Sequence, residues 1–293
     1  MPSPKLRVQT TTLWEYPSQH YGDGEQGSKD YRGATPSYII WNLLERYTKK
    51  NDLVVDPFCG SGTTLDVAAD MKRKALGYDL QPHHERVIRA DARDLPLENN
   101  KADFVFMDPP YGDNLTYSGL PECIGEIPAT DPRYFEAFEQ VFAEAERILR
   151  PGRYLAVYVS DIWKSSAFVP IGSILSEMLA QRFLPVDHIA VVRGNKDLEK
   201  GNYHKSAEEE KFFLRGFNHL LIFKKPEAGE VRRARVEGKV RQRKESREMG
   251  DPKREDGRGP RRGGGGGRRS GRSGGSGGGQ RRGGGGGPWN SGR

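Results

Sequence analysis

The segment most suited to chemistry runs from Asp56 to Thr64 and reads Asp-Pro-Phe-Cys-Gly-Ser-Gly-Thr-Thr. Gly60 and Gly62 allow the backbone to turn sharply and to approach a ligand closely. A helix is expected over 64–71, and its first amide groups would point at that ligand. The loop has no lysine and no Gly-Lys-Ser/Thr, which disfavours a phosphate-cradling loop and leaves a plain strand-to-helix turn as the alternative.

Two acidic positions further along the chain extend this interpretation. Asp79 follows about twenty residues later, at the end of an expected strand, where a carboxylate can accept hydrogen bonds from both hydroxyls of a ribose. Asp91 and Ala92 follow the next short segment and are candidates for hydrogen bonds to the edge of an adenine ring. With Asp79 in place, the loop predicts a nucleoside cofactor.

A second segment, Asp108-Pro109-Pro110-Tyr111, ends another apolar run. Prolines fix the backbone and remove N–H donors, so the Pro109 carbonyl and the Asp108 carboxylate are left as acceptors. Two acceptors facing one pocket suit an exocyclic NH2 group, and Tyr111 offers an aromatic face for a planar base. The alternative is a strand end followed by a turn that the prolines make rigid.

The expected elements place both segments at one edge of a sheet. Strands alternating with helices predict a mostly parallel sheet with helices on both faces, and ligands in such folds bind at the carboxyl ends of the strands. Residues 80–85 are short for a parallel crossover, so the sequence leaves open whether 86–89 joins the sheet. Thr35 is expected to cap the first helix, with Pro36 at its first position. The expected strands are 53–56, 75–79, 86–89, 102–108, 154–159, 186–192 and 219–223, and the expected helices are 35–50, 64–71, 133–149 and 171–180.

Charge is distributed unevenly along the 293 residues, whose net charge is +7. Residues 226–293 carry 19 Lys and Arg against 8 Asp and Glu, whereas residues 1–225 are mildly acidic. We expect an N-terminal arm (1–35), one α/β domain (36–225), a charged linker (226–256) and an Arg/Gly-rich tail (257–293) that is disordered because it has almost nothing apolar to bury.

The tail composition predicts a nonspecific tether for nucleic acid, RNA included, since arginine binds phosphates and stacks on bases. A tail that only increases solubility is the alternative. Residues 112–132 and 193–215 are candidate specificity segments.

Several classes of protein are disfavoured by composition. The sequence has no apolar run of the roughly 20 residues that a membrane helix needs, and its first 16 residues lack the apolar core of a signal peptide. Two cysteines are too few for a disulfide framework, so a cytoplasmic location is expected. The histidines are scattered and no Cys/His cluster has metal-ligand spacing, so no metal is expected.

Together the two segments resemble a known family. Asp56–Thr64 resembles the S-adenosylmethionine-binding motif of the amino-methylating (adenine N6 or cytosine N4) DNA methyltransferases, and Asp108–Tyr111 resembles their catalytic motif. The resemblance is specific over residues 36–111 and looser over 112–225. It implies a Rossmann-like methyltransferase fold and S-adenosylmethionine as methyl donor. The cofactor contacts it implies are Asp56, Pro57, Phe58, Cys59, Gly60, Gly62, Thr63, Asp79, Asp91 and Ala92.

The resemblance also implies a mechanism and a DNA substrate. The target base is flipped out of the duplex and stacked on Tyr111, while Asp108 and the Pro109 carbonyl hold its amino group and aim the nitrogen at the methyl donor. The implied catalytic residues are therefore Asp108, Pro109, Pro110 and Tyr111. Aspartate at the first position of the motif favours adenine N6 over cytosine N4.

Three other functions bear on the same residues. Cytosine-C5 methylation needs a nucleophilic cysteine, typically after a proline, and neither Cys59 nor Cys123 has that setting. An RNA guanine-N2 methyltransferase remains an alternative because such enzymes use a similar Pro-Pro-Tyr motif. A nucleic-acid-binding protein with an inactive methyltransferase fold also remains. The sequence leaves the target site and the oligomeric state open.

Overall fold

The computed structural model describes residues 6–230 except 17, 29, 32, 113–116, 165, 193–200 and 229. The linker and the Arg/Gly tail expected after residue 225 lie almost entirely outside the described residues. Among the described helices, none is long and apolar enough to cross a membrane.

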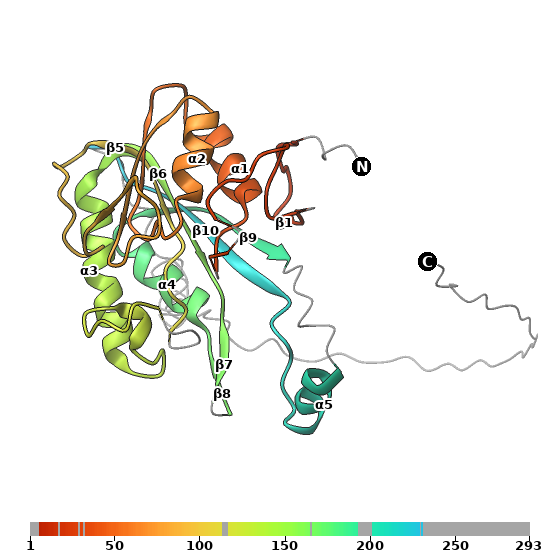
Figure 1. Cartoon of the computed structure of the whole chain (residues 1–293). Helices are drawn as coiled ribbons and strands as arrows, with labels where there is room; N and C mark the ends of the chain where they lie inside the picture. The colour runs from red at the N-terminus through yellow and green to blue at the C-terminus, as the bar shows by residue number, and fades with distance from the viewer. Residues whose placement is uncertain are drawn as a thin grey trace, which may run out of the picture. The chain divides into compact units, whose positions relative to one another are not determined.

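A central sheet organises the described residues (Figure 1). Its eight described strands lie in the order β1-β9-β10-β6-β5-β2-β3-β4, and the five from β6 to β4 run parallel to one another. Only β10 runs antiparallel to its neighbours β6 and β9. The strands are β1 (Leu13–Trp14), β2 (Leu53–Asp56), β3 (Lys74–Asp79), β4 (Val87–Arg89), β5 (Ala102–Met107), β6 (Leu149–Val159), β9 (Leu184–Val192) and β10 (Phe217–Lys224).

Helices cover both faces of this sheet. Alternate strand residues point to opposite faces, so Val54 and Phe104 pack with α1 and α2, whereas Val55 and Val105 pack with α3 and α4. The predicted fold class, a Rossmann-like α/β fold with a mostly parallel central sheet, is therefore confirmed. The helices are α1 (Ser37–Tyr47), α2 (Thr63–Asp70), α3 (Pro132–Ile148), α4 (Ile171–Ala180) and α5 (Gly201–Glu209), with a 3-10 turn at Ile124–Glu126.

The short segment 86–89 does join the sheet. β4 pairs in parallel with β3 at the end of that strand, with Gly77 opposite Val87 and Asp79 opposite Arg89. β4 therefore starts opposite Gly77, two residues before the end of β3. After leaving β3 at Asp79, the chain has to run back beside that strand by only about 7 Å before it enters β4. The connection over 80–86 therefore needs no helix to cross over.

The capping role predicted for Thr35 is wrong. Helix α1 begins at Ser37, Pro36 occupies the N-cap position, and no side chain caps the helix. The Thr35 hydroxyl instead donates a hydrogen bond to the Asp108 carboxylate. At α3 the helix does have a local cap, since Asp131 accepts from the Arg133 N–H at 2.9 Å and Pro132 opens the helix.

The N-terminal segment packs on the sheet and on α2. β1 pairs in parallel with β9, Gly27 N–H donates to Asp66 at 2.8 Å, and the Tyr21 hydroxyl donates to Asp70 at 2.9 Å. This course brings Tyr31 and Thr35 to the carboxyl edge of the sheet, beside both sequence motifs.

Besides β1 and the 3-10 turn, a hairpin and a helix have no counterpart in the sequence-based prediction. The hairpin is formed by β7 (Ile162–Lys164) and β8 (Ala167–Val169) and follows β6. The helix is α5, which lies in the candidate specificity segment 193–215.

Candidate active site

The loop between β2 and α2 is held in shape by Asp56. This aspartate is buried, and it accepts hydrogen bonds from the Phe58 N–H at 2.9 Å and from the Thr64 hydroxyl at 2.5 Å. Burial raises the pKa of Asp56 to about 7, although both hydrogen bonds oppose that rise. The Asp56 carboxylate thus joins the two ends of the loop by hydrogen bonds.

The two glycines of the loop occupy conformations that other residues rarely adopt. Gly60 has φ of +47° and Gly62 has φ of +86°, both in the left-handed region. A Cβ on Gly60 would lie 2.9 Å from the Tyr31 ring, and one on Gly62 would lie 2.9 Å from the His84 ring. Gly60 lines the cavity described below, whereas Gly62 does not line it and forms the N-cap of α2.

Cys59 lies within the same loop but is not suited to nucleophilic attack. Its thiol is buried against Gly77, where an added Cβ would come within 2.4 Å of the sulfur. Burial and the neighbouring carboxylates, Asp56 first, raise the pKa of the Cys59 thiol well above its ordinary value. A thiol in this setting remains protonated at neutral pH.

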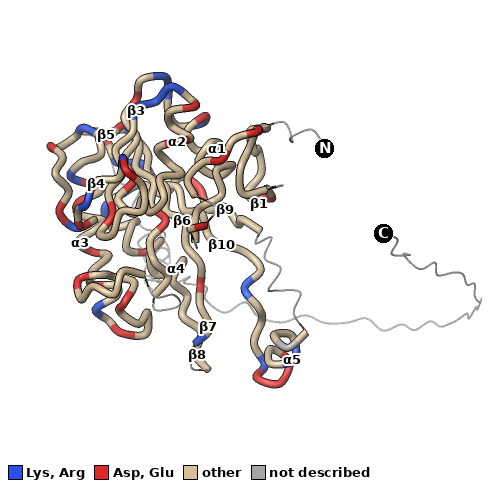
Figure 2. The backbone as a smooth tube through the Cα atoms, in the orientation of Figure 1, with Lys and Arg blue, Asp and Glu red and all other residues tan. Residues whose placement is uncertain are grey.

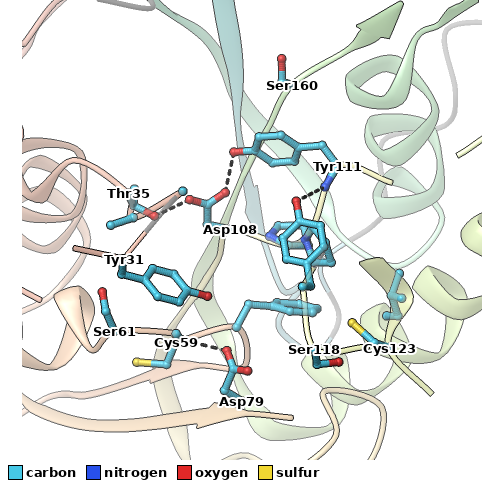
Figure 3. Close-up of a pocket in the computed structure, with 18 of the residues that line it drawn as sticks. Tyr31, Thr35, Cys59, Ser61, Asp79, Asp108, Tyr111, Ser118, Cys123 and Ser160 are labelled. Carbon is cyan, nitrogen blue, oxygen red and sulfur yellow. Dashed lines mark hydrogen bonds between the residues drawn. The ribbon is translucent and has the colours of Figure 1, made fainter. Parts of the chain in front are cut away.

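Asp79 lies beside the loop at the carboxyl end of β3 (Figure 3). Its carboxylate accepts from the Gly60 N–H and from the Gln81 N–H, each at 2.9 Å. Burial raises the pKa of Asp79 against these two hydrogen bonds. The structure therefore fixes this carboxylate at the cavity wall, and each oxygen retains a lone pair that can accept a ligand hydroxyl.

Asp91 and Ala92 follow β4 and also line the cavity. Asp91 pairs with Arg93, accepting at 2.9 Å from the Arg93 Nε and at 2.6 Å from Nη2. Burial acts to raise the pKa of Asp91, but the bonds from Arg93 outweigh it and lower the pKa. Arg93 also donates to the Glu122 carbonyl at 2.8 Å, which joins this edge of the cavity to the segment after the Pro-Pro-Tyr motif.

Asp108 lies at the end of β5 and is held by two hydroxyl groups (Figure 3). Tyr111 donates to one carboxylate oxygen at 2.6 Å, and Thr35 donates to the other. Burial raises the pKa of Asp108 to about 7, and both hydrogen bonds oppose that rise. The sequence predicts that an amino group of a base would occupy these oxygens, whereas the structure shows protein hydroxyls there.

The remainder of the second motif forms a rigid corner. The Pro110 carbonyl accepts from the Tyr134 hydroxyl at 2.7 Å, and Tyr111 N–H donates to the Tyr117 hydroxyl at 3.3 Å. Within the described part of the chain, no donor reaches the Pro109 carbonyl, so this acceptor is available to a ligand.

Most of these groups line one cavity of about 910 Å³. That volume lies at the upper end of the range for small-molecule sites. Every predicted site residue except Gly62 lines it, so the structure brings the glycine-rich loop and the Pro-Pro-Tyr corner to a single site. The predicted residues that line it are Asp56, Pro57, Phe58, Cys59, Gly60, Thr63, Asp79, Asp91, Ala92, Asp108, Pro109, Pro110 and Tyr111.

Several lining residues carried no signal in the sequence. Tyr31 and Thr35 come from the N-terminal segment, and the Tyr31 ring faces the same space as Asp79 and Asp108 (Figure 3). Burial, followed by the charges of Asp79 and Asp108, raises the pKa of the Tyr31 hydroxyl. Trp163 and Phe212 reach the cavity from the β7–β8 hairpin and from the segment after α5.

Charged residues are interspersed along the described backbone (Figure 2), but the described lining of the cavity is predominantly acidic. It contains five aspartates and one arginine, Arg215. Such a site favours a ligand with a cationic centre over a phosphate. Among the described residues, no group of three or more His, Cys, Asp or Glu side chains is arranged to hold a metal ion.

Residues 3–90 match the sequence profile of a family described as DNA methylase, N6_N4_Mtase. The matched residues include the glycine-rich loop and Asp79 but not Asp108–Tyr111.

Curated relatives match over short stretches. Type II methyltransferase M.MthZI of Methanothermobacter thermautotrophicus is 28% identical over 108 residues, which cover 32% of this chain and 30% of the relative. Type II methyltransferase M2.LlaDCHI of Lactococcus lactis subsp. cremoris is 39% identical over 54 residues, 18% of this chain and 20% of the relative. A tRNA (guanine(10)-N2)-dimethyltransferase of Methanothermobacter thermautotrophicus is 36% identical over 86 residues, 24% of this chain and 25% of the relative. The matched segments thus span less than a third of each of these relatives.

Among solved structures, TrmN from Thermus thermophilus superposes with a TM-score of 0.44 at 18% identity, covering 66% of this chain and 50% of that chain. The structural similarity is low. The similarity to the amino-methylating (N6/N4) DNA methylases therefore rests on the sequence match over residues 3–90 and on the type II relatives.

Proposed function

We propose that this protein transfers a methyl group from S-adenosylmethionine to the exocyclic amino group of a DNA base, adenine N6 first and cytosine N4 second. The observation that carries the proposal is the shared cavity, in which Asp79 and Gly60 face the same space as Asp108 and Tyr111.

The chemistry of the cavity fits the methyl donor. Asp79 offers carboxylate oxygens for ribose hydroxyls beside a glycine turn that permits close approach. The acidic lining is complementary to a sulfonium ion, and the absence of lysine from the described lining is consistent with a ligand that carries no phosphate. When bound, S-adenosylmethionine supplies an electrophilic methyl group on a positively charged sulfur.

Binding of the base requires a rearrangement at Asp108. An amino group that hydrogen-bonds the carboxylate oxygen now held by Tyr111 displaces the tyrosine hydroxyl, and the released ring then offers its face to the base. Thr35 keeps its hold on the other oxygen, which fixes the direction of the carboxylate. The Pro109 carbonyl accepts the second amino hydrogen.

Transfer then needs only positioning and a proton acceptor. Asp108 and the Pro109 carbonyl would aim the lone pair of the amino nitrogen at the methyl group of bound S-adenosylmethionine, which would supply the methyl carbon for the new N–C bond and keep the electron pair of the broken S–C bond. The nitrogen loses its extra proton to Asp108, whose pKa of about 7 suits a base that works near neutral pH.

The elevated pKa of Asp108 predicts how the rate depends on pH. Only the ionised carboxylate accepts hydrogen bonds from the amino group and takes its proton, so single-turnover methylation should increase as pH rises through about 7 and then level off. Cofactor binding measured in the same buffers separates this effect from loss of the donor. A rate that is flat or falls across this range contradicts the assignment of Asp108 as proton acceptor.

The activity itself is tested by labelling. The protein is incubated with tritiated S-adenosylmethionine and unmethylated duplex DNA, tRNA or rRNA, and the labelled nucleoside is identified after digestion. N6-methyladenine from DNA supports the first assignment and N4-methylcytosine the second; sequencing the labelled DNA then locates the target site.

A second candidate is an RNA guanine-N2 methyltransferase. The observation that favours it is the match over 86 residues to the tRNA (guanine(10)-N2)-dimethyltransferase. N2-methylguanine in tRNA or rRNA from the same labelling experiment would establish this candidate. If cofactor binds but no substrate is labelled, the result supports the remaining interpretation, a nucleic-acid-binding protein with an inactive methyltransferase fold.

The Arg/Gly tail, outside the described residues, is proposed to tether nucleic acid without sequence preference. Residues 257–293 contain nine arginines. Deleting them should flatten the dependence of log Kd on log salt by about 0.9 for each arginine that contacts a phosphate of duplex DNA. Fluorescence anisotropy of a labelled duplex at several salt concentrations measures the slope. An unchanged slope assigns the tail no role in binding.

A further inference from the structure

Aromatic side chains gather at the cavity wall on segments that carried no motif. Trp163 of β7 stacks on Phe212, with ring centroids 4.9 Å apart and an interplanar angle of 12°. Phe213, the next residue, is 86% exposed and lines the same cavity as Asp108. Phe213 is therefore a large apolar side chain that lines the proposed active site and is also open to solvent.

The backbone that carries Phe213 is held on both sides. The Phe212 N–H donates to the Ala207 carbonyl of α5 at 3.0 Å, which ties the segment to that helix. The Phe213 carbonyl accepts from Arg215 Nε at 3.1 Å and from the Arg215 Nη2 as well. The Arg215 guanidinium in turn lies 5.0 Å from the centre of the Phe168 ring in β8. The exposed Phe213 side chain therefore projects from a segment whose backbone is held by hydrogen bonds.

The proposed reaction creates a need for such a group. A base within a duplex cannot reach Asp108, so it must leave the stack, and its departure leaves a gap between neighbouring base pairs. Apolar side chains that enter a base stack fill gaps of this kind, and phenylalanine is one of the residues used. A group that fills the gap must be exposed, rigidly supported and close to the mouth of the cavity that receives the base.

Phe213 meets all three requirements, and Arg215, two residues further on, would offer a positive charge to the phosphates of a bound duplex. We propose that Phe213 is a wedge that enters the base stack of duplex DNA when the target base leaves it, supported by the stacked pair Trp163 and Phe212. The proposal rests on the proposed DNA methyltransferase function and adds to it the residue that holds the duplex open.

The test compares two duplexes that contain the target site located by the labelling experiment. In one, the target base is paired normally; in the other, the opposite nucleotide is abasic, so the target base has no pairing to lose. We expect F213A to slow single-turnover methylation of the paired duplex about tenfold or more, and that of the abasic-partner duplex less than about twofold. F213L, which retains an apolar wedge, should recover most of the rate.

Two further measurements sharpen the comparison. With 2-aminopurine at the target position, fluorescence should rise when the unmodified protein binds and rise much less with F213A, because fewer bases leave the stack. F217A is the matched control, since Phe217 is also exposed (45%) but does not line the cavity; its rates should match those of the unmodified protein. Thermal unfolding should be unchanged in F213A because its side chain is exposed.

An equal loss of rate on both duplexes overturns the wedge, because Phe213 would then act in a step other than base extrusion. Unchanged rates on both duplexes overturn it too, and the aromatic surface would then be a contact for a protein partner. If the unmodified protein labels neither duplex nor genomic DNA, the proposed function fails and the wedge fails with it. If the unmodified protein labels both duplexes and only the rates of F213A differ from those expected, the wedge proposal alone fails.

Discussion

Asp108→Ala is expected to lower methyl transfer by about 10³-fold while leaving the affinity for S-adenosylmethionine nearly unchanged. The carboxylate is the group to which Thr35 and Tyr111 both donate, and in the proposed mechanism it holds the amino group and accepts its proton. Alanine removes both roles and also removes a buried group whose pKa is about 7. Single-turnover labelling of duplex DNA gives the rate, and calorimetric titration with the cofactor gives the affinity.

Two control variants separate chemistry from folding. Thr35→Val retains the carboxylate but removes one of its two donors, so it should reduce the rate far less than Asp108→Ala. Glu85→Ala removes an exposed carboxylate from the connection between β3 and β4, and it should have no effect. If Asp108→Ala retains more than about a tenth of the rate, another residue carries the step.

The parts of the fold that the sequence predicted are those in which local pattern and burial agree. The apolar runs that end at Asp56, Asp79 and Asp108 became β2, β3 and β5, because buried parallel strands need continuous apolar residues. Since carboxyl ends of parallel strands share one edge, the meeting of the two motifs in one cavity also followed from sequence.

What the sequence could not provide depends on contacts between distant segments. Thr35 before Pro36 has the local pattern of a helix cap, yet its hydroxyl bonds Asp108, 73 residues away. Tyr31 lies against Gly60 only because the N-terminal segment packs on α2 through Gly27 and Tyr21. Contacts between residues so far apart in the sequence cannot be predicted from local sequence preferences.

The aromatic wall of the cavity was missed for a related reason. Residues 193–215 contain many polar and charged side chains, which favoured a loop, and β7 and β8 are only three residues long. Trp163 and Phe212 are 49 positions apart, and their stacking depends on the placement of both segments beside β6 and β10. Whether residues 86–89 join the sheet could not be decided from the length of the connection before them. The register of β4 against β3 decides it, because only three residues pair and a short connection is then long enough.

Asp79→Ala should weaken cofactor binding by about 100-fold or more, because the ribose hydroxyls would lose a charged acceptor, and hydrogen bonds to charged groups contribute about 1.5–3 kcal/mol each. The loss has a second source in the structure. Asp79 also accepts from the Gly60 N–H at 2.9 Å, so its removal frees the turn that gives the cofactor close access to the backbone. Titration with S-adenosylhomocysteine, which lacks the reactive methyl group, measures the affinity without turnover.

Asp79→Asn distinguishes the two contributions. The amide retains one oxygen that can still accept from Gly60 but carries no charge, so its affinity should lie between those of the unmodified protein and the alanine variant. The rate at saturating cofactor should recover in both variants, because Asp108 and Tyr111 remain in place. If Asp79→Ala binds the cofactor as tightly as the unmodified protein does, the ribose is held elsewhere, and the glycine-rich loop would then serve only to turn the chain from β2 into α2.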